Sequence, residues 1–499
     1  MKKIYAYILL AATLMLSACS GFLDIRKEAT VPTSGMDYSN SQNIFQPVSA
    51  AYAAMRWSSF QSNEGISLSY LTLNEIISDD AEKGSESADG PDIKEIDEFR
   101  FTPTNPHINT VWIKFFDIVS AANYAIEAMD RFTSSLQNED DLAYAAKCKG
   151  EAFVIRAYAY FNLVRLFGTV PVIKGTMSSE ELAAMKVSSV EEIYKFIYQD
   201  LDAAIAALPE KWDGYDGRYD VYTARALKAK VALYNKDWNE AAAQADEIIA
   251  CERFSLLPDF RQVFAVEGEN SSESLMEIQS TCLGQTAGAV PATSYSYVQG
   301  PRQNQPSNMQ GWGFNVPSSS LVKFLKDRGD EIRYATTILE RGTVTPEGDA
   351  ILDKCANPYY NGKVYTPSRY NIMGNNSYGL EHNVRVIRYA DILLIYAEAL
   401  GNSAPVGAKS GKSADDALNE VRTRAGLGTV SDTLDNIYEE RRAELAMEEN
   451  RFFDLVRWGK AAEVLGPLGF KAGKNEVFPI PSSQRQLNPN LPATTGYTY

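Results

Sequence analysis

The chain contains very little histidine and cysteine. Its 499 residues include only two histidines, His107 and His382, and five cysteines. Two histidines are a poor supply for histidine-based metal centres or for catalytic triads, so no metal or cofactor is expected. The cysteines, at positions 19, 148, 251, 282 and 355, contain no C-x-x-C pair. This pattern matches neither a zinc ribbon nor a disulfide-dense scaffold, and it leaves room for one or two disulfides without assigning them.

The chain also lacks an excess of positive charge. It has 48 basic and 64 acidic residues, a formal net charge of −16 at pH 7. Nucleic acids and anionic lipid surfaces attract basic proteins, so this balance argues against both as partners. Long apolar runs are scarce as well, and no stretch after the N-terminus approaches the length of a membrane-spanning helix.

The N-terminus has the layout of a bacterial lipoprotein signal. A basic start precedes an apolar run at 4–16, which is too short to span a bilayer and which leads into Leu16-Ser17-Ala18-Cys19. We expect residues 1–18 to be a signal peptide and Cys19 to carry lipid that anchors the mature chain. The alternative is an ordinary signal peptide in which Cys19 occurs by chance.

Most of the remaining chain has helical patterns. Apolar residues recur at helical spacing in 110–132, and 151–167 is apolar on nearly every face, which is typical of a buried helix. Gly168 should end that helix, and a capping box of Ser189 and Glu192 should begin the next, which runs to about 208. The predicted fold class is therefore mostly all-α.

One segment predicts a tetratricopeptide-like helical hairpin. In Tyr222–Ala250, two alanine-rich helices flank a tight turn at 235–237, and small side chains let antiparallel helices approach closely. Weaker candidate pairs are 385–401 with 413–425, and 151–167 with 189–208. The loops between these helices vary in length, so an irregular stack of helix pairs is a better prediction than a regular solenoid.

Three loop-rich insertions interrupt the helical pattern. We predict one domain, 19–499, with a helical scaffold at about 40–280 and 318–499 and with insertions at about 79–99, 283–317 and 357–379. Long irregular segments in compact proteins usually carry function. The second and third insertions are rich in aromatic residues, which argues against plain disorder.

The 283–317 insertion contains the chemistry of a carbohydrate site. Sugars offer apolar faces that stack on aromatic rings and hydroxyls that bind polar side chains. The predicted stacking residues are Trp312 with Tyr295 or Tyr297, and the predicted polar contacts are Arg302, Asn304, Asn315 and Asp79. The alternative is that Trp312 only pins the loop to the core. Tyr359 and Tyr360 are the next candidates.

Two charged clusters favour structural roles. Glu444 and Glu448 are four residues apart, which predicts one helix face, and arginines at 441, 442 and 451 lie close by. We interpret this cluster as an ion-pair network rather than a catalytic carboxylate pair. The acidic stretch 79–92 does not have the spacing of a calcium-binding loop, so we predict a solvated loop there.

Several short motifs, taken in order, resemble the SusD/RagB family of outer-membrane nutrient-binding lipoproteins of Bacteroidetes. The resemblance runs nearly end to end. The motifs are Cys19-Ser20-Gly21-Phe22-Leu23-Asp24, Arg156-Ala157-Tyr158, Phe167-Gly168-Thr169-Val170-Pro171, Glu277-Ile278-Gln279, Arg388-Tyr389-Ala390-Asp391, Tyr396-Ala397-Glu398-Ala399, Leu418-Asn419-Glu420-Val421-Arg422-Thr423-Arg424-Ala425-Gly426, Glu440-Arg441-Arg442-Ala443-Glu444-Leu445, Arg451-Phe452-Phe453-Asp454-Leu455-Val456-Arg457-Trp458 and Phe478-Pro479-Ile480-Pro481.

The resemblance implies a tetratricopeptide-like scaffold with a loop-rich ligand site. It also implies a lipid-anchored, outward-facing outer-membrane protein that delivers glycans, without cleaving them, to a SusC-like TonB-dependent transporter. The shared motifs are mostly scaffold residues, so they do not identify the ligand. Two alternatives are a surface glycoside hydrolase, which needs two converging carboxylates, and a tetratricopeptide-type interaction scaffold that binds no sugar.

Overall fold

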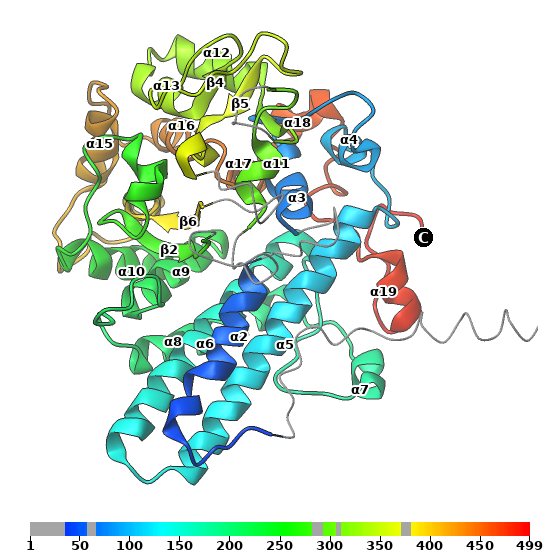
Figure 1. Cartoon of the computed structure of the whole chain (residues 1–499), viewed down its shortest axis with the longest axis vertical. Coiled ribbons are helices and arrows are strands. Elements are labelled where there is room, and N and C mark those ends of the chain that lie inside the picture. Colours follow the sequence, from blue (N-terminus) through cyan, green and yellow to red (C-terminus); the bar gives the residue numbers. More distant parts are fainter. Residues whose placement is uncertain (1–34, 57–65, 282–292, 306–310, 371–380) are drawn as a thin grey trace, which may run out of the picture. The chain divides into compact units, whose positions relative to one another are not determined.

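Helices dominate the structure, a computed structural model that describes residues 35–56, 66–281, 293–305, 311–370 and 381–499. Its contacts divide the chain into residues 1–37 and residues 38–499, and the fold described here is that of the second unit. The predicted class, mostly all-α, is confirmed (Figure 1). Cys19 lies outside the described residues. In the described part, no helix is both long and apolar enough to cross a bilayer.

The elements of this unit are as follows, in chain order. The α-helices are α2 (Phe45–Met55), α3 (Ile66–Leu71), α4 (Pro91–Asp97), α5 (Pro106–Ser135), α6 (Glu139–Phe167), α7 (Ser179–Ala184), α8 (Val190–Ala207), α9 (Val221–Tyr234), α10 (Trp238–Ala250), α11 (Tyr295–Gln299), α12 (Ser319–Asp327), α13 (Glu331–Thr337), α14 (Tyr389–Gly401), α15 (Ala414–Arg424), α16 (Leu434–Leu445), α17 (Arg451–Arg457), α18 (Ala461–Leu465) and α19 (Ser482–Leu487). The strands form antiparallel pairs, namely β1 (Ala81–Gly84) with β3 (Phe314–Pro317), β2 (Ser274–Ile278) with β6 (Val384–Arg388), and β4 (Ile338–Glu340) with β5 (Tyr359–Asn361).

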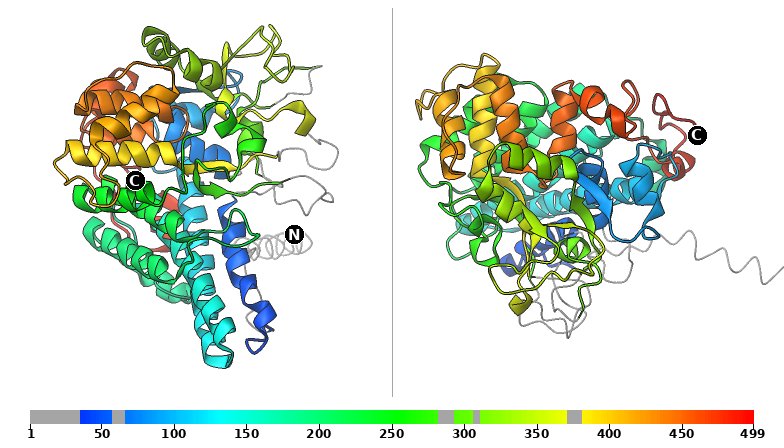
Figure 2. Two further views of the ribbon diagram at one scale, coloured as in Figure 1. Left: turned by 90° about the vertical axis from the view of Figure 1, so that its left-hand side faces the viewer. Right: turned by 90° about the horizontal axis from the view of Figure 1, so that it is seen from above.

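The predicted helical hairpin is confirmed. Helices α9 and α10 pack against each other, and both contain fully buried alanines such as Ala229 and Ala245. The pairs α6–α8 and α14–α15 also pack together, and α14 contacts α10 and α16. Helix α8 begins with the predicted reciprocal capping box of Ser189 and Glu192. The left-hand view of Figure 2 shows this stack of helices, from green through yellow to orange.

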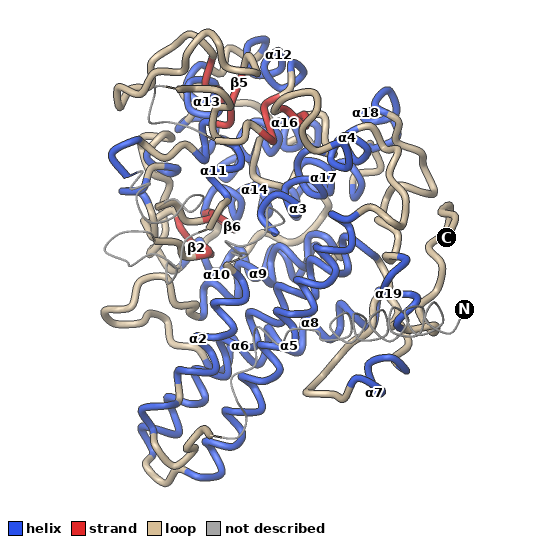
Figure 3. Tube along the Cα trace, turned by 45° about the vertical axis from the view of Figure 1, so that its right-hand side comes forward, coloured by secondary structure: helices blue, strands red, loops and turns tan. Residues whose placement is uncertain are grey.

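The loop-rich part surrounds the three short sheets. In Figure 3 the strands β5 and β6 and many of the long loops lie around α11 and α13, whereas α2, α5, α6 and α8 form a body with few loops. The start of the predicted helix 385–401 is a strand, because 384–388 pairs with β2 and the helix begins only at Tyr389. The insertions at 79–99 and 283–317 contribute β1 and β3, which pair with each other.

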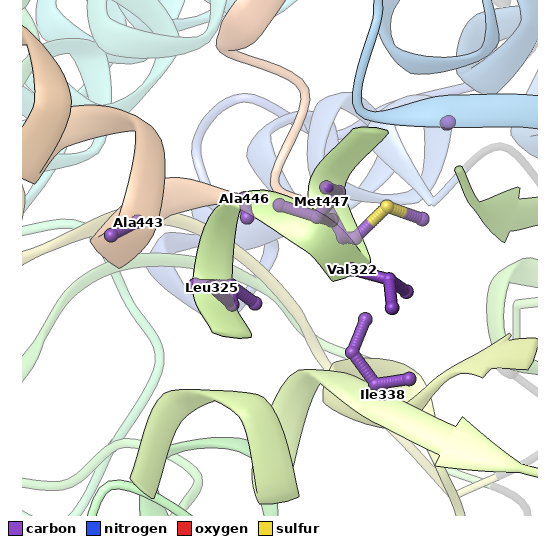
Figure 4. Packing of buried hydrophobic residues seen from close by; sticks show 8 residues of the cluster. Val322, Leu325, Ile338, Ala443, Ala446 and Met447 are labelled. Atoms are coloured by element: carbon purple, nitrogen blue, oxygen red, sulfur yellow. The ribbon is translucent and has the colours of Figure 1, made fainter. Parts of the chain in front are cut away.

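The predicted placement of Glu444 and Glu448 on one helix is wrong. Helix α16 ends at Leu445, Met447 and Glu449 have positive φ angles of 63° and 57°, and α17 begins only at Arg451. This break places Met447, only 1% exposed, in a cluster with Val322, Leu325 and Ile338 (Figure 4). Burial of the methionine side chain offsets part of the cost of a left-handed residue.

The ion-pair interpretation of the two carboxylates is confirmed, but their partners are not the nearby arginines at 441, 442 and 451, which pair with aspartates instead. Glu444 is fully buried and forms ion pairs with Arg333, Arg388 and Arg424. Arg388 also pairs with Glu448. Burial alone would raise the pKa of the Glu444 carboxyl, but the three guanidinium groups hold that pKa well below its ordinary value. These carboxylates therefore stay ionised and enclosed.

The predicted solvated loop at 79–92 is wrong at its start. Asp80 is fully buried and Asp79 is 9% exposed. Arg451 donates to both carboxylate oxygens of Asp79 at 2.8 and 3.0 Å, and Arg442 lies 2.7 Å from Asp80 Oδ1. Cationic partners from α16 and α17 explain how an acidic pair can be buried, since a buried charge needs a partner.

The described cysteines are unpaired. Cys148 and Cys355 are buried, Cys251 is partly buried, and none of the three forms a disulfide. Cys282 lies outside the described residues. Within the described ranges, the acidic, histidine and cysteine side chains form no group that could hold a metal ion.

Candidate ligand-binding site

The pairing of β1 with β3 builds the candidate site. Gly84 lies opposite Phe314 in this ladder, and the Ser85 N–H donates to the Gly313 carbonyl oxygen at 2.5 Å. The turn at 85–89 is thereby held beside the segment 311–313. Two distant parts of the sequence form one surface only because these short strands pair.

Glycines let 311–313 lie against the end of α11. A Cβ on Gly311 would lie 2.3 Å from the Tyr297 carbonyl oxygen. Gly313 has a φ of 70°, and a Cβ there would lie 2.8 Å from Arg302 Cβ. The Trp312 N–H donates to the Tyr297 carbonyl oxygen at 3.1 Å, and the Gly313 N–H donates to Gly300 at 2.8 Å. This close backbone approach requires glycine.

Trp312 is half-buried between the core and a guanidinium group. Its ring packs against a cluster that includes Ile76, Ile93 and Phe314. The Arg302 guanidinium carbon lies 4.5 Å from the ring centroid, a cation–π contact. The alternative interpretation is therefore partly right, because the packing of Trp312 against the core holds the loop there. Trp312 and Arg302 are both only partly buried.

An acidic pair lies beside Arg302. Arg302 Nε is 3.5 Å from Glu86 Oε1, and its Nη2 is 3.4 Å from Asp89 Oδ2. A hydrogen bond from Ser85 Oγ, a second one from the Glu86 N–H, and the Arg302 charge lower the pKa of the Asp89 carboxyl. The Lys83 ammonium fixes the turn by donating to the carbonyl oxygens of Glu86 and Asp89 at 2.8 and 2.6 Å. The result is a fixed, partly exposed set of charges around an indole.

Four of the predicted site residues are buried and used within the protein. Tyr295 is 4% exposed and its hydroxyl donates to Glu449, while Asp79 pairs with Arg442 and Arg451. The Asn304 amide donates to the Ala350 carbonyl oxygen and its oxygen accepts from the Leu352 N–H, which ties two loops together. The Asn315 amide, at a φ of 53°, donates to Gln299.

The structure therefore brings together three of the predicted residues. Trp312 and Arg302 are in contact, and the half-buried Tyr297 is joined to Trp312 through its backbone. Of the next candidates, Tyr360 is fully buried and Tyr359 packs against the cluster around Val322. Glu86 and Asp89, which lie beside Arg302, are not among the residues predicted for the site. The sequence feature that could have indicated them is the high density of charge in a Ser- and Gly-containing turn. The sequence does not show, however, which other segment of the chain lies beside that turn.

Comparison with known proteins identifies the family. A model of the SusD family matches residues 343–469, and a model described as "Starch-binding associating with outer membrane" matches residues 22–233. "SusD-like protein P2" of Formosa agariphila is 30% identical over the full length of both chains. A SusD-like protein of Bacteroides ovatus is 27% identical over 72% of this chain and 67% of its own. The chain belongs to the SusD family, as its motifs predict.

Solved structures agree with this assignment. A "Laminarin binding SusD-like protein" is 29% identical, with a TM-score of 0.78 over 92% of this chain and 100% of its own. Surface glycan-binding protein A from Bacteroides thetaiotaomicron, solved in complex with laminarihexaose, has a TM-score of 0.77 over 91% of this chain and 99% of its own. At 23% identity, the second likeness is evidence for the fold alone.

Proposed function

We propose that this protein captures oligosaccharides at the outer-membrane surface and delivers them to a SusC-like TonB-dependent transporter. Membership of the SusD family supports glycan binding as the class of function. The description of the family model that matches residues 22–233 mentions starch binding and the outer membrane. The observation that carries the proposal is the Trp312 site, where an indole, a guanidinium group and two carboxylates meet on a rigid turn.

The chemistry of this site fits a sugar ring. The exposed part of Trp312 offers an apolar surface for C–H groups, while Arg302, Glu86 and Asp89 offer donors and acceptors for hydroxyls. Tyr297, also half-buried, is the proposed second aromatic contact. Both signs of charge are present and paired, which favours a neutral glycan over an anionic one.

The protein is proposed to act without cleaving its ligand. The conspicuous carboxylates of the C-terminal region are enclosed: Glu444 is fully buried, and Arg388 and Lys363 hold the pKa of the Glu448 carboxyl below its ordinary value despite burial, which acts to raise it. A hydrolase needs a general acid with a raised pKa in an open cleft. Anchoring through lipid on Cys19 would keep the capture site at the cell surface.

Calorimetric titration of a glycan panel tests the proposal. The panel should include laminarihexaose, and the chain should lack residues 1–19. Trp312→Ala should weaken binding about ten- to hundredfold, since loss of a stacking aromatic costs on the order of 1–3 kcal/mol by analogy with base stacking. Tyr499→Ala, which removes an exposed ring elsewhere in the sequence, is the control. Normal affinity in a folded Trp312→Ala variant would refute the site, and shortened products on chromatography would refute the absence of cleavage.

A further inference from the structure

A polar cleft lies on the helical scaffold and shares no residue with the Trp312 site. Its volume is about 230 Å³. Its walls come from the loop 211–220 between α8 and α9, from residues 253–254 after α10, and from residues 270–277 leading into and along β2. Nothing in the proposed mechanism of capture uses this cleft.

An exposed aromatic ring lines the cleft. Tyr215 is 63% exposed, which is unusual for a large aromatic residue. Beside it, Trp212 is half-buried, and its indole N–H donates to the Tyr219 carbonyl oxygen at 2.9 Å. The Arg218 guanidinium carbon lies 3.6 Å from the Trp212 ring centroid, so it covers one face of the indole. Tyr215 is therefore the aromatic side chain of the cleft that is most accessible to a ligand.

Both arginines of the cleft are already paired with carboxylates, and the cleft is also lined by Lys211, Asp216 and Glu277. Arg218 donates from Nε to Glu151 Oε1 at 3.0 Å, and Glu151 is fully buried. Arg253 donates to Asp220 Oδ2 at 2.6 Å. Each guanidinium thus already has its carboxylate, and an anionic ligand would have to compete with it. A ligand without charge binds here at no such cost.

The remaining wall carries small polar groups. Asn270, Ser271, Ser272 and Ser274 supply amide and hydroxyl groups along the stretch that leads into β2. Short polar groups in the same cleft as an exposed ring match the hydroxyls and the apolar face of a sugar. Within the protein the Asn270 amide also bonds to Gln279, Ser272 to Ser255 and Ser274 to Glu277. The volume lies below the roughly 300–1,000 Å³ typical of sites for drug-sized ligands, which suits one or two sugar rings.

The loop that forms the cleft is held in place before any ligand arrives. Gly217 has a φ of 86°, and a Cβ there would lie 2.4 Å from Gln279 Cδ. The Tyr219 N–H donates to the Tyr52 hydroxyl oxygen at 2.8 Å, which fixes the loop to α2. A preformed site loses less entropy on binding than one that must be ordered.

From these observations we propose that the Tyr215 cleft is a second binding site for neutral mono- or disaccharide units. The proposal rests on the proposed function, since it assigns a second contact for the same class of ligand. Two sites on one chain would hold a long glycan at two points and raise its overall affinity through effective concentration.

Titration of the full chain with neutral disaccharides tests this second site. The chain is kept in a detergent without a sugar headgroup, and the probes are laminaribiose, cellobiose, maltose, xylobiose and mannobiose. The Trp312→Ala variant should retain binding of at least one probe. On that background, Tyr215→Ala should weaken the remaining binding about tenfold or more, and Ser272→Trp, which fills the cleft, should abolish it. Tyr499→Ala should change nothing.

Each outcome decides between the two sites. If Trp312→Ala alone removes all disaccharide binding, the second site is refuted while the proposed function stands. If binding survives in Trp312→Ala but Tyr215→Ala and Ser272→Trp leave it unchanged, the second site is also refuted, because the residual binding lies elsewhere. If the wild-type chain binds neither these probes nor the larger glycan panel, both proposals fall together.

Discussion

Replacement of Glu444 by glutamine should destabilise the protein strongly without touching the ligand site. The Glu444 carboxylate lies 2.5 Å from Arg424, 2.9 Å from Arg388 and 3.2 Å from Arg333, and it is fully buried. Glutamine keeps the shape of the side chain and removes its charge. Each cation retains some compensation in the variant. Arg333 would keep Asp330 and Glu440, Arg388 would keep Glu273 and Glu448, and Arg424 would keep Glu273.

The expected loss of stability follows from the free-energy cost of breaking a buried ion pair. Removing one partner typically costs about 3–5 kcal/mol, because the other charge stays buried. Unfolding entropy of about 2.1 cal/mol/K per residue, over the roughly 460 residues of the second unit, amounts to about 1 kcal/mol/K. The same loss should therefore lower the Tm by about 3–5 °C if the unit unfolds as one.

Scanning calorimetry over a range of pH tests the reasoning. The folded-state pKa of Glu444 is depressed, so its contribution is present above the unfolded value of about 4.5 and is lost as pH falls toward the folded value. The gap between wild type and Glu444→Gln should then shrink below about pH 4. Glu439→Gln is the matched control, since Glu439 is on the same helix but 60% exposed and pairs with Arg328 at the surface. A Tm change below about 1 °C for Glu444→Gln, or a gap independent of pH, would refute the network as a source of stability.

Three further predictions concern the anchor, a buried acid and the site turn. Cys19→Ala should move the protein from the membrane to the soluble fraction, and unchanged retention with unaltered mass would contradict lipidation. Burial raises the pKa of the Glu449 carboxyl to about 7, so its contribution to stability falls as pH rises from about 4.5 to 7. Urea denaturation should show that the free energy of unfolding of Glu449→Gln, relative to that of the wild type, is higher at pH 8 than at pH 5, by up to about 3 kcal/mol. Gly313→Ala should cost about 1–2 kcal/mol from its positive φ, plus the clash with Arg302, and should weaken glycan binding in calorimetry. Gly473→Ala, at a similar φ of 77° with open space around it, is the control and should leave binding unchanged.

The helices were predicted well because the features that define them depend on residues close together in the sequence. The capping box of Ser189, the stop at Gly168 and the alanine contacts of α9 with α10 all depend on residues close together in sequence. The break between α16 and α17 depends on distant residues. The Glu449 N–H donates to Glu75 at 2.5 Å, and Met447 fills a cluster built by α12 and β4. The spacing of residues within 438–460 therefore cannot predict either contact.

The candidate site was only partly predictable for the same reason. Composition found Trp312 and Arg302, because aromatic and polar residues in a loop are visible in the sequence. It also selected Tyr295, whose hydroxyl is instead taken by Glu449, more than a hundred residues away. Glu86 and Asp89 reach Arg302 only through the pairing of β1 with β3. Which side chains a loop exposes is decided by its tertiary neighbours.

The helical scaffold and the candidate site are connected through one set of ion pairs. Arg442 and Arg451, both within motifs of the family, bind Asp79 and Asp80 directly before β1. Strand β1 in turn pairs with β3, which begins two residues after Trp312. These two arginines therefore hold the start of β1 in place, and through the β1–β3 pairing they support the segment that carries Trp312.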